Sequence, residues 1–360
     1  MFFPNINFLR GFAALLVLVY HVIELAPWPS FPTQGAALTL RIGWVGVDLF
    51  FVISGFVIGL SAIRLQREGD ADFSATFLRR RLARIVPLYL FTSAAFLFLI
   101  QPSLLLLPWN LLLLQIGGHL VFLHNLHPWL HSTINGANWS VAAEMQFYVL
   151  AILMVPLLSR VRVRWIFAGG LLVAWISRAA AYWLTRDLGN AHVTFVYATQ
   201  VPSMADEFAI GICLARLQLD GAIPRFAARY GPWALVPSAC GLAVALYFAW
   251  GIYWAHPDYW GNPWMVVFWR TALGLTFGAL VLLAVQLPDL TRVWPLRPFD
   301  YLGEISYGIY LWHLPVLLAL GKMPVTASPA TMLWMTLAGV ITLAALTWHL
   351  FEQPLIRKYR

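Results

Sequence analysis

The sequence predicts an all-α polytopic membrane protein with ten transmembrane helices. Of its 360 residues, 61% are hydrophobic and only 11% are charged, whereas soluble domains carry about 25% charged residues. The mean hydropathy is +0.75. Apolar stretches of about 20 residues, the length that spans a bilayer, recur along the whole chain. The expected spans are residues 8–25, 44–62, 85–102, 138–158, 164–184, 193–215, 232–250, 264–286, 301–320 and 329–350.

The basic residues predict the orientation of these helices. With the N-terminus in the cytoplasm, 18 of the 23 Lys and Arg residues fall on the inner side, as the positive-inside rule requires, and ten spans return the C-terminus to the cytoplasm. An eleventh span at 104–123 would reverse every later loop. This proline- and glycine-flanked stretch is therefore expected to be non-spanning or re-entrant. The exceptions to the rule are Arg41, Arg178, Arg186, Arg270 and Lys322.

Composition also limits the possible partners and the domain organisation. The net charge of +8 is distributed between apolar runs and follows the orientation rule, so a nucleic-acid partner is not expected. Cys213 and Cys240 lie in apolar stretches and predict neither a disulfide framework nor a metal site. Residues 1–360 are expected to form a single transmembrane domain, with no fused soluble domain, embedded in the lipid bilayer.

The first apolar stretch carries two ionisable residues that mark a candidate site. Arg10 and His21 are eleven residues apart, which places them within about 20° of the same helix face and roughly 16 Å apart along the axis. Ionisable groups are costly in lipid and usually face a cavity or a partner. A cation near one membrane face and an imidazole deep in the bilayer therefore predict a functional stripe. The alternative is an anchoring Arg and a structural His.

Three further ionisable residues are expected at the depth of His21. In the predicted orientation Asp48, Glu144 and His313 all lie about one to two turns below the outer surface, each on a different helix. Mutual pairing is the least costly arrangement for buried charges, and a His beside a carboxylate is a recurring general base. We expect catalytic roles for these four residues, with Asp48 or Glu144 orienting His21. A structural polar network is the alternative.

A second candidate site lies at the inner surface. The segment FLRRRLARIVPLY places Arg81 and Arg84 three residues apart, hence on one helix face, and guanidinium groups bind phosphates bidentately. The alternatives are topology alone or contact with anionic lipid. In the segment 43–59, Ser54 is a candidate ligand contact or a local backbone bond, and Gly55 and Gly59 indicate close helix packing.

Four histidines between the third and fourth spans are candidate metal ligands. Pro128 interrupts their helical spacing, and no Cys or carboxylate accompanies them, so no metal is expected. The residues are His119, His124, His127 and His131.

Six motifs resemble the membrane acyltransferase-3 family over essentially the whole chain. They are Arg10-(x)10-His21, GVDLFFVISGF at 46–56, RRRLARIVPLY at 79–89, WSVAAEMQFY at 139–148, SYGIYLWHLPV at 306–316 and FEQPLIR at 351–357. The chain departs from the family pattern at Asn7-Phe8, where Asp-Gly is usual, and at WSV, where WSL is usual.

The resemblance implies a ten-helix bacterial inner-membrane enzyme that O-acylates carbohydrates with acyl-CoA, typically acetyl-CoA. It implies an essential His21, with Arg10, Arg81 and Arg84 at the donor site. Combined with the expected geometry, it suggests that acyl-CoA contacts the inner arginines while a carbohydrate or glycolipid hydroxyl meets His21 from outside. Transfer through an acyl-His intermediate is the mechanistic alternative to direct transfer. A transporter or flippase of lipid-linked saccharide is the alternative function, since intramembrane charges also mark transport pathways.

Overall fold

The computed structural model describes residues 3–26, 28–69, 72–256, 258–323 and 327–358, and these residues form helices and loops with no strand. Among them, eight helices are long and apolar enough to cross a membrane, which supports a multi-pass membrane protein. The α-helices are α1 (Pro4–Leu25), α2 (Gly46–Arg67), α3 (Phe73–Ala95), α4 (Trp109–Leu120), α5 (Asn138–Leu158), α6 (Val163–Thr185), α7 (Ala191–Ala198), α8 (Ala205–Leu219), α9 (Ala222–Tyr230), α10 (Leu235–Ala255), α11 (Arg270–Gln286), α12 (Pro298–Glu304), α13 (Ser306–Gly321), α14 (Pro329–Thr347) and α15 (Gln353–Lys358).

Two of the ten expected spans are interrupted, so the count of ten stays an expectation. The stretch 193–215 is divided into α7, a short 3₁₀ turn at Val201–Met204 and α8. Pro202 in that turn has no N–H to continue an α-helical ladder. The stretch 301–320 breaks at Ile305, which separates α12 from the 16-residue α13. An apolar run predicts that a segment is buried in lipid or protein, but it does not show where the helix is interrupted.

The stretch 104–123 contains a short helix. At 12 residues α4 is about 18 Å long, too short to cross a hydrocarbon core of about 30 Å. The third expected span begins earlier than residue 85, because α3 starts at Phe73 and continues through a π turn at Phe96–Ile100. The arginines at 79–84 therefore lie on a helix, which fixes Arg81 and Arg84 on one face.

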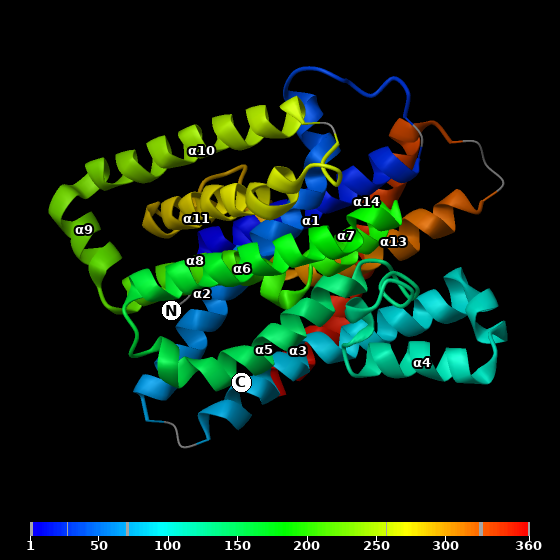
Figure 1. Cartoon of the computed structure of the whole chain (residues 1–360), viewed down its shortest axis with the longest axis horizontal. Helices are drawn as coiled ribbons and strands as arrows, with labels where there is room; N and C mark the ends of the chain where they lie inside the picture. Colours follow the sequence, from blue (N-terminus) through cyan, green and yellow to red (C-terminus); the bar gives the residue numbers. More distant parts are fainter. Residues whose placement is uncertain (1–2, 27, 70–71, 257, 324–326, 359–360) are drawn as a thin grey trace.

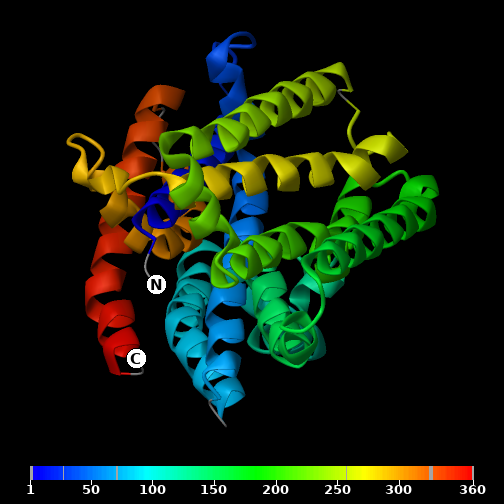
Figure 2. The same ribbon diagram turned by 90° about the vertical axis from the view of Figure 1, so that its left-hand side faces the viewer.

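α2 occupies the centre of the helix assembly and contacts α1, α5, α8 and α11. Figure 1 shows α10 and α11 running together along one edge, with α4 at the opposite edge. In the turned view of Figure 2, the C-terminal helices (red) lie on the other side of α2 (blue) from α5 and α6 (green). The residues that line the candidate site come from α2 and from helices that surround it.

The most extensive helix contact, between α2 and α8, depends on two glycines. A Cβ atom on Gly55 would overlap the backbone oxygen of Phe208, and one on Gly211 would overlap the backbone of Val52 and Phe56. The close approach predicted for Gly55 is confirmed. Such close backbone approach is how small residues drive helix association in membranes.

Replacing either glycine by alanine is expected to destabilise the protein. A methyl group forced against backbone atoms costs about 1–3 kcal/mol or more, because neither helix can move without disturbing its other contacts. Thermal unfolding of purified Gly55→Ala and Gly211→Ala should show a lower midpoint than wild type. Gly251→Ala in α10 is the control, since nothing lies within 4 Å of a Cβ atom there. Equal midpoints for all three variants would contradict the packing argument.

Candidate active site

A cavity of about 70 Å³ contains the three arginines singled out from the sequence. Arg10 comes from α1, and Arg81 and Arg84 from α3, one turn apart on the same face. None of the three belongs to a salt bridge within the described part of the chain. Three guanidinium groups that carry no ion pair form a site suited to an anion, and the arginine fork matches phosphate oxygens.

Ser54 and Glu144 line the same cavity. The Ser54 hydroxyl donates to Glu144 Oε1 at 2.6 Å, and the Tyr148 hydroxyl donates to the same oxygen at 2.8 Å. The Arg81 guanidinium lies over the Tyr148 ring at 5.8 Å. Glu144 is thereby held among the arginines by α2 and α5, and its single negative charge leaves the cavity positively charged.

His21 lines a second, larger cavity of about 420 Å³. Aromatic rings make up much of its wall, among them Trp44, Trp139 and Trp260, while Asp48 and Arg270 supply its charged side chains. The ring of His21 therefore lines a cavity inside the protein. Its catalytic role stays a prediction beside the alternative of a structural histidine.

Backbone bonding determines which nitrogen of His21 is available as a base. Its Nδ1 lies 2.9 Å from the carbonyl oxygen of Val17, one turn earlier on α1. A carbonyl oxygen only accepts, so Nδ1 carries the hydrogen of the neutral ring and Nε2 keeps its lone pair. No side-chain hydrogen bond to His21 occurs among the described residues, so the prediction that Asp48 or Glu144 orients the ring is wrong. The Val17 carbonyl orients the ring instead, because each carbonyl oxygen of a helix lies one turn before the side chain that can bond it.

His313 lies beside His21 but behind the cavity wall. The two imidazole centroids are 4.8 Å apart. Nδ1 of His313 bonds the carbonyl oxygen of Tyr310, and its Nε2 is buried without a partner in the described structure. His313 therefore lies next to His21, as expected, and contacts it through the imidazole rings.

Asp48 lines the cavity of His21 but pairs with Arg270. Its Oδ1 accepts from Arg270 Nη1, and both side chains are buried. Glu144 is in the other cavity, so the four residues expected at one depth do not converge on one point. The sequence estimate used depth along each helix alone, whereas helix rotation decides which cavity a side chain enters.

Tyr310 separates the two cavities. Tyr310 and Val47 are lining residues of both. The Tyr310 hydroxyl and the Ser140 hydroxyl are 2.6 Å apart and form a buried hydrogen bond. The arginine cavity and the histidine cavity are thus neighbours that share Tyr310 and Val47 in their walls.

Comparison with protein families identifies the enzyme class. A family model described as an acyltransferase domain matches residues 3–350. The chain belongs to this membrane acyltransferase family. It is therefore an enzyme, and the resemblance drawn from the six motifs is confirmed.

Three relatives of this acyltransferase have informative names. A Komagataeibacter xylinus protein whose name describes a membrane-bound transacylase (BcsY) is 29% identical over 98% of this chain and 84% of its own length. A Bacillus subtilis protein named as a peptidoglycan O-acetyltransferase (YrhL) is 26% identical over 98% of this chain and 55% of its own. The O-acetyltransferase OatA of Staphylococcus aureus is 24% identical over 99% of this chain and 58% of its own. The chain thus spans just over half the length of the last two, and no solved structure matches it.

Sequence reasoning missed several charged residues of this acyltransferase. Arg178 and Arg270 had been assigned as exceptions to the positive-inside rule, but both are buried in ion pairs, Arg178 with Asp206 and Arg270 with Asp48. Glu352, part of the motif at 351–357, is buried in a π turn at Trp348–Glu352. Rarity of charge in apolar stretches was the signal that could have found Asp206 and Arg178.

The four histidines at 119–131 do not assemble a three-ligand metal group within the described residues. Instead His119 and His124 stack face to face with centroids 3.9 Å apart. Both are buried, as is His131, while His127 is exposed. Burial, and next the neighbouring His119, lowers the pKa of His124 to about 3. Burial also lowers the pKa of His131 to about 3.

These buried histidines predict that acid destabilises the protein. Below about pH 6.5 the unfolded chain takes up a proton at His124 that the folded chain accepts only near pH 3, so stability is lost as the pH falls through this window. At about pH 5 the loss is about 2 kcal/mol for each such histidine. His124→Asn should show a smaller drop in thermal midpoint between near pH 7.5 and about pH 5 than wild type. The exposed His127→Asn is the control, and an unchanged drop in His124→Asn would refute the assignment.

Proposed function

We propose that this protein is an integral-membrane O-acyltransferase of the bacterial inner membrane. In this proposal it moves an acetyl group from cytoplasmic acetyl-CoA to a hydroxyl of an extracytoplasmic or lipid-linked carbohydrate. The observation that carries the proposal is the pair of adjoining cavities. Among the described residues, the three arginines that line one cavity form no salt bridge, and the histidine that lines the other bonds the Val17 carbonyl through Nδ1, which leaves Nε2 for a substrate.

The arginine cavity suits the donor. The nucleotide end of an acyl-CoA carries several phosphates, and Arg10, Arg81 and Arg84 line the cavity without a salt bridge to any described residue. A long pantetheine arm would then have to pass Tyr310 to bring its thioester to His21. Tyr310 is held in this wall by its hydrogen bond to Ser140 and by ring contacts with Phe50 and His313, so its side chain would have to move for the arm to pass.

The aromatic cavity suits the acceptor. The faces of aromatic rings carry partial negative charge and attract the polarised C–H groups on a sugar face. Trp44, Trp139 and Trp260 supply such faces around His21. The names of two relatives specify O-acetyltransferases, one of them acting on peptidoglycan, which supports a carbohydrate hydroxyl as the acceptor.

The proposed reaction needs one base. His21 Nε2 takes the proton of the acceptor hydroxyl as its oxygen attacks the thioester carbonyl carbon. The tetrahedral intermediate collapses with cleavage of the C–S bond, and His21 returns the proton to the departing thiolate, releasing CoA and the ester. The Val17 carbonyl holds the ring in the tautomer that keeps Nε2 free and stabilises the imidazolium between the two proton transfers.

Purified protein in nanodiscs, incubated with radiolabelled acetyl-CoA and methyl glucoside as a model acceptor, tests the proposal. We expect free CoA to appear and the label to move to the sugar. In a second arm, mass spectra of envelope glycans from cells with the protein should show acetyl esters that are missing without it. Absence of both effects, together with saccharide movement across liposomes, would replace the proposal by a flippase.

Single-turnover trapping distinguishes the two acyl-transfer routes. In direct transfer, protein quenched after mixing with labelled acetyl-CoA in the absence of acceptor carries no label. Label retained on wild type and lost in His21→Gln would instead identify an acyl-His intermediate.

A further inference from the structure

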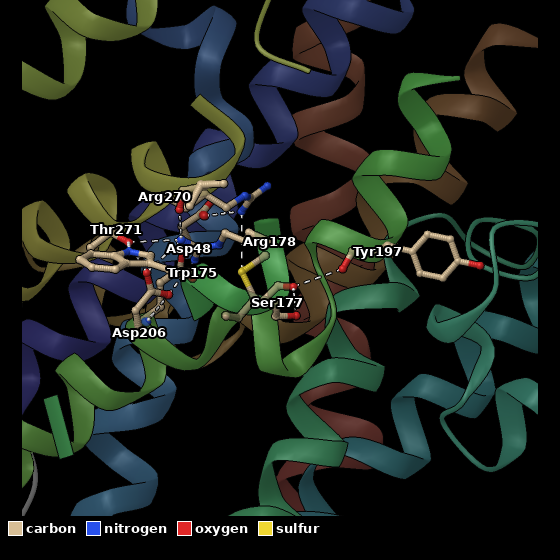
Figure 3. A network of polar contacts seen from close by, with 12 residues as sticks. Asp48, Trp175, Ser177, Arg178, Tyr197, Asp206, Arg270 and Thr271 are labelled. Carbon is tan, nitrogen blue, oxygen red and sulfur yellow. Dashed lines mark hydrogen bonds and ion pairs between the residues drawn. The ribbon is translucent and has the colours of Figure 1, made fainter. Parts of the chain in front are cut away.

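A group of five buried charged residues lies between α2, α6, α8 and α11, beside the aromatic cavity. Arg178 binds Asp206 through two bonds of 3.0 and 2.6 Å, and the Thr271 hydroxyl donates to the same carboxylate (Figure 3). Arg270 pairs with Asp48. The fifth member, Glu207, follows Asp206 on α8 and is fully buried. None of the reactions proposed above uses Glu207.

The charges in this group do not balance. Arg178 and Arg270 contribute two positive charges, and an arginine side chain does not lose its proton in a protein. Asp48, Asp206 and Glu207 contribute three negative charges if all are ionised. An excess negative charge without solvent or partner is one of the most costly arrangements in a protein interior, and a carboxyl group avoids it by binding a proton.

The hydrogen-bonding geometry shows where that proton is needed. The Glu207 carboxyl lies within hydrogen-bonding reach of Asp48. As carboxylates, Asp48 Oδ2 and both oxygens of Glu207 are buried with no donor among the described residues. The oxygens of Asp206, in contrast, accept from Arg178, Thr271 and the Glu207 backbone N–H. A single hydrogen between Glu207 and Asp48 supplies the missing donor and restores charge balance.

We propose that Asp48 and Glu207 form a proton-binding site, in which one proton is held at neutral pH with Glu207 as the protonated member donating to Asp48 Oδ2. The groups that face this pair are Arg270 from α11, Asp206 from α8, which Arg178 from α6 neutralises, and the buried Tyr259, which lies near Asp48 and Arg270. The site keeps the wall of the aromatic cavity neutral while Asp48 still holds Arg270 in place. The inference is independent of the acyl-transfer proposal, because it depends only on burial, charge and missing donors.

Infrared spectroscopy tests the site directly. A protonated carboxyl group has a C=O stretching band that a carboxylate lacks and that shifts in D₂O. The difference spectrum of wild type minus Glu207→Gln, recorded at neutral pH on purified protein, should contain this band. Asp48→Asn should also remove it, because two carboxylates then balance two guanidinium groups. Glu68→Gln, which changes an exposed carboxylate paired with Arg64, is the control and should remove no acid band.

A second measurement compares each protein with itself at two pH values, so the wild-type result does not depend on how well the variants fold. Raising the pH should convert the acid band to carboxylate bands, and the neutral-minus-alkaline spectrum of Glu207→Gln should lack that conversion. Absence of an acid band in wild type at neutral pH overturns the proposal. Absence of the band together with a thermal midpoint that rises with Na⁺ concentration also overturns it and assigns a cation to the place of the proton. Neither outcome depends on whether the protein transfers acetyl groups.

Discussion

His21→Gln is expected to lower acetyl transfer by about 10²- to 10⁴-fold, the usual contribution of a general base. Glutamine retains an N–H that can bond the Val17 carbonyl and fills similar space, but it offers no nitrogen lone pair at the position of Nε2. Binding of the donor should change little, because the arginine cavity lies on the other side of Tyr310. The measurement is the initial rate of CoA release and of label transfer by purified protein.

The matched control for this variant is His256→Gln. The His256 ring also bonds the carbonyl oxygen one turn earlier, Ile252, at 2.9 Å, but it is exposed and lines neither of the two cavities. We expect wild-type rates from this control, and unchanged elution and thermal midpoint for both variants. A His21→Gln protein that transfers acetyl at a near-normal rate would remove His21 from the mechanism.

Arg81→Gln and Arg84→Gln are each expected to weaken use of acetyl-CoA. A charge-assisted hydrogen bond to phosphate contributes about 1.5–3 kcal/mol, so each variant should raise the KM for acetyl-CoA by about 10- to 100-fold. The effect on kcat should be smaller, because in the proposed reaction these residues contact the donor far from the reacting thioester. Initial rates over a range of acetyl-CoA concentrations separate the two constants.

Arg79→Gln is the control for these two variants. Arg79 lies on the same helix, α3, but is exposed and does not line the arginine cavity. Its replacement alters the surface charge of α3 without removing a cavity guanidinium, so the KM should stay near that of wild type. An equal rise in KM for Arg79→Gln would mean that the arginines act through general surface charge and not as ligands.

Much of the site follows from the position of charge along an apolar chain. Arg10 and His21 could be placed on one helix face from their spacing, and each lines one of the two neighbouring cavities. Arg81 and Arg84 likewise share a face and a cavity. These predictions concern residues on the same helix, where a period of 3.6 residues determines the relative direction of two side chains.

The sequence did not predict which side chains on different helices would contact one another. Asp48 and Glu144 were expected near His21 because their depths agreed, yet one pairs with Arg270 and the other with Ser54. Nothing in the sequence indicated which carboxylates would pair with Arg178 and Arg270. Which helix faces which, and at what rotation, is set by close packing such as the crossing of Gly55 and Gly211.

The sequence by itself determined that this protein is a helical membrane enzyme of the acyltransferase class, because hydropathy, helical period and motif order are properties of the chain. Only the tertiary structure decided that these residues divide between two cavities with Tyr310 between them, and that three buried carboxyl groups face two arginines. The physical reason is that burial and pairing of charge arise when separate helices pack together, and no spacing along one helix contains that information.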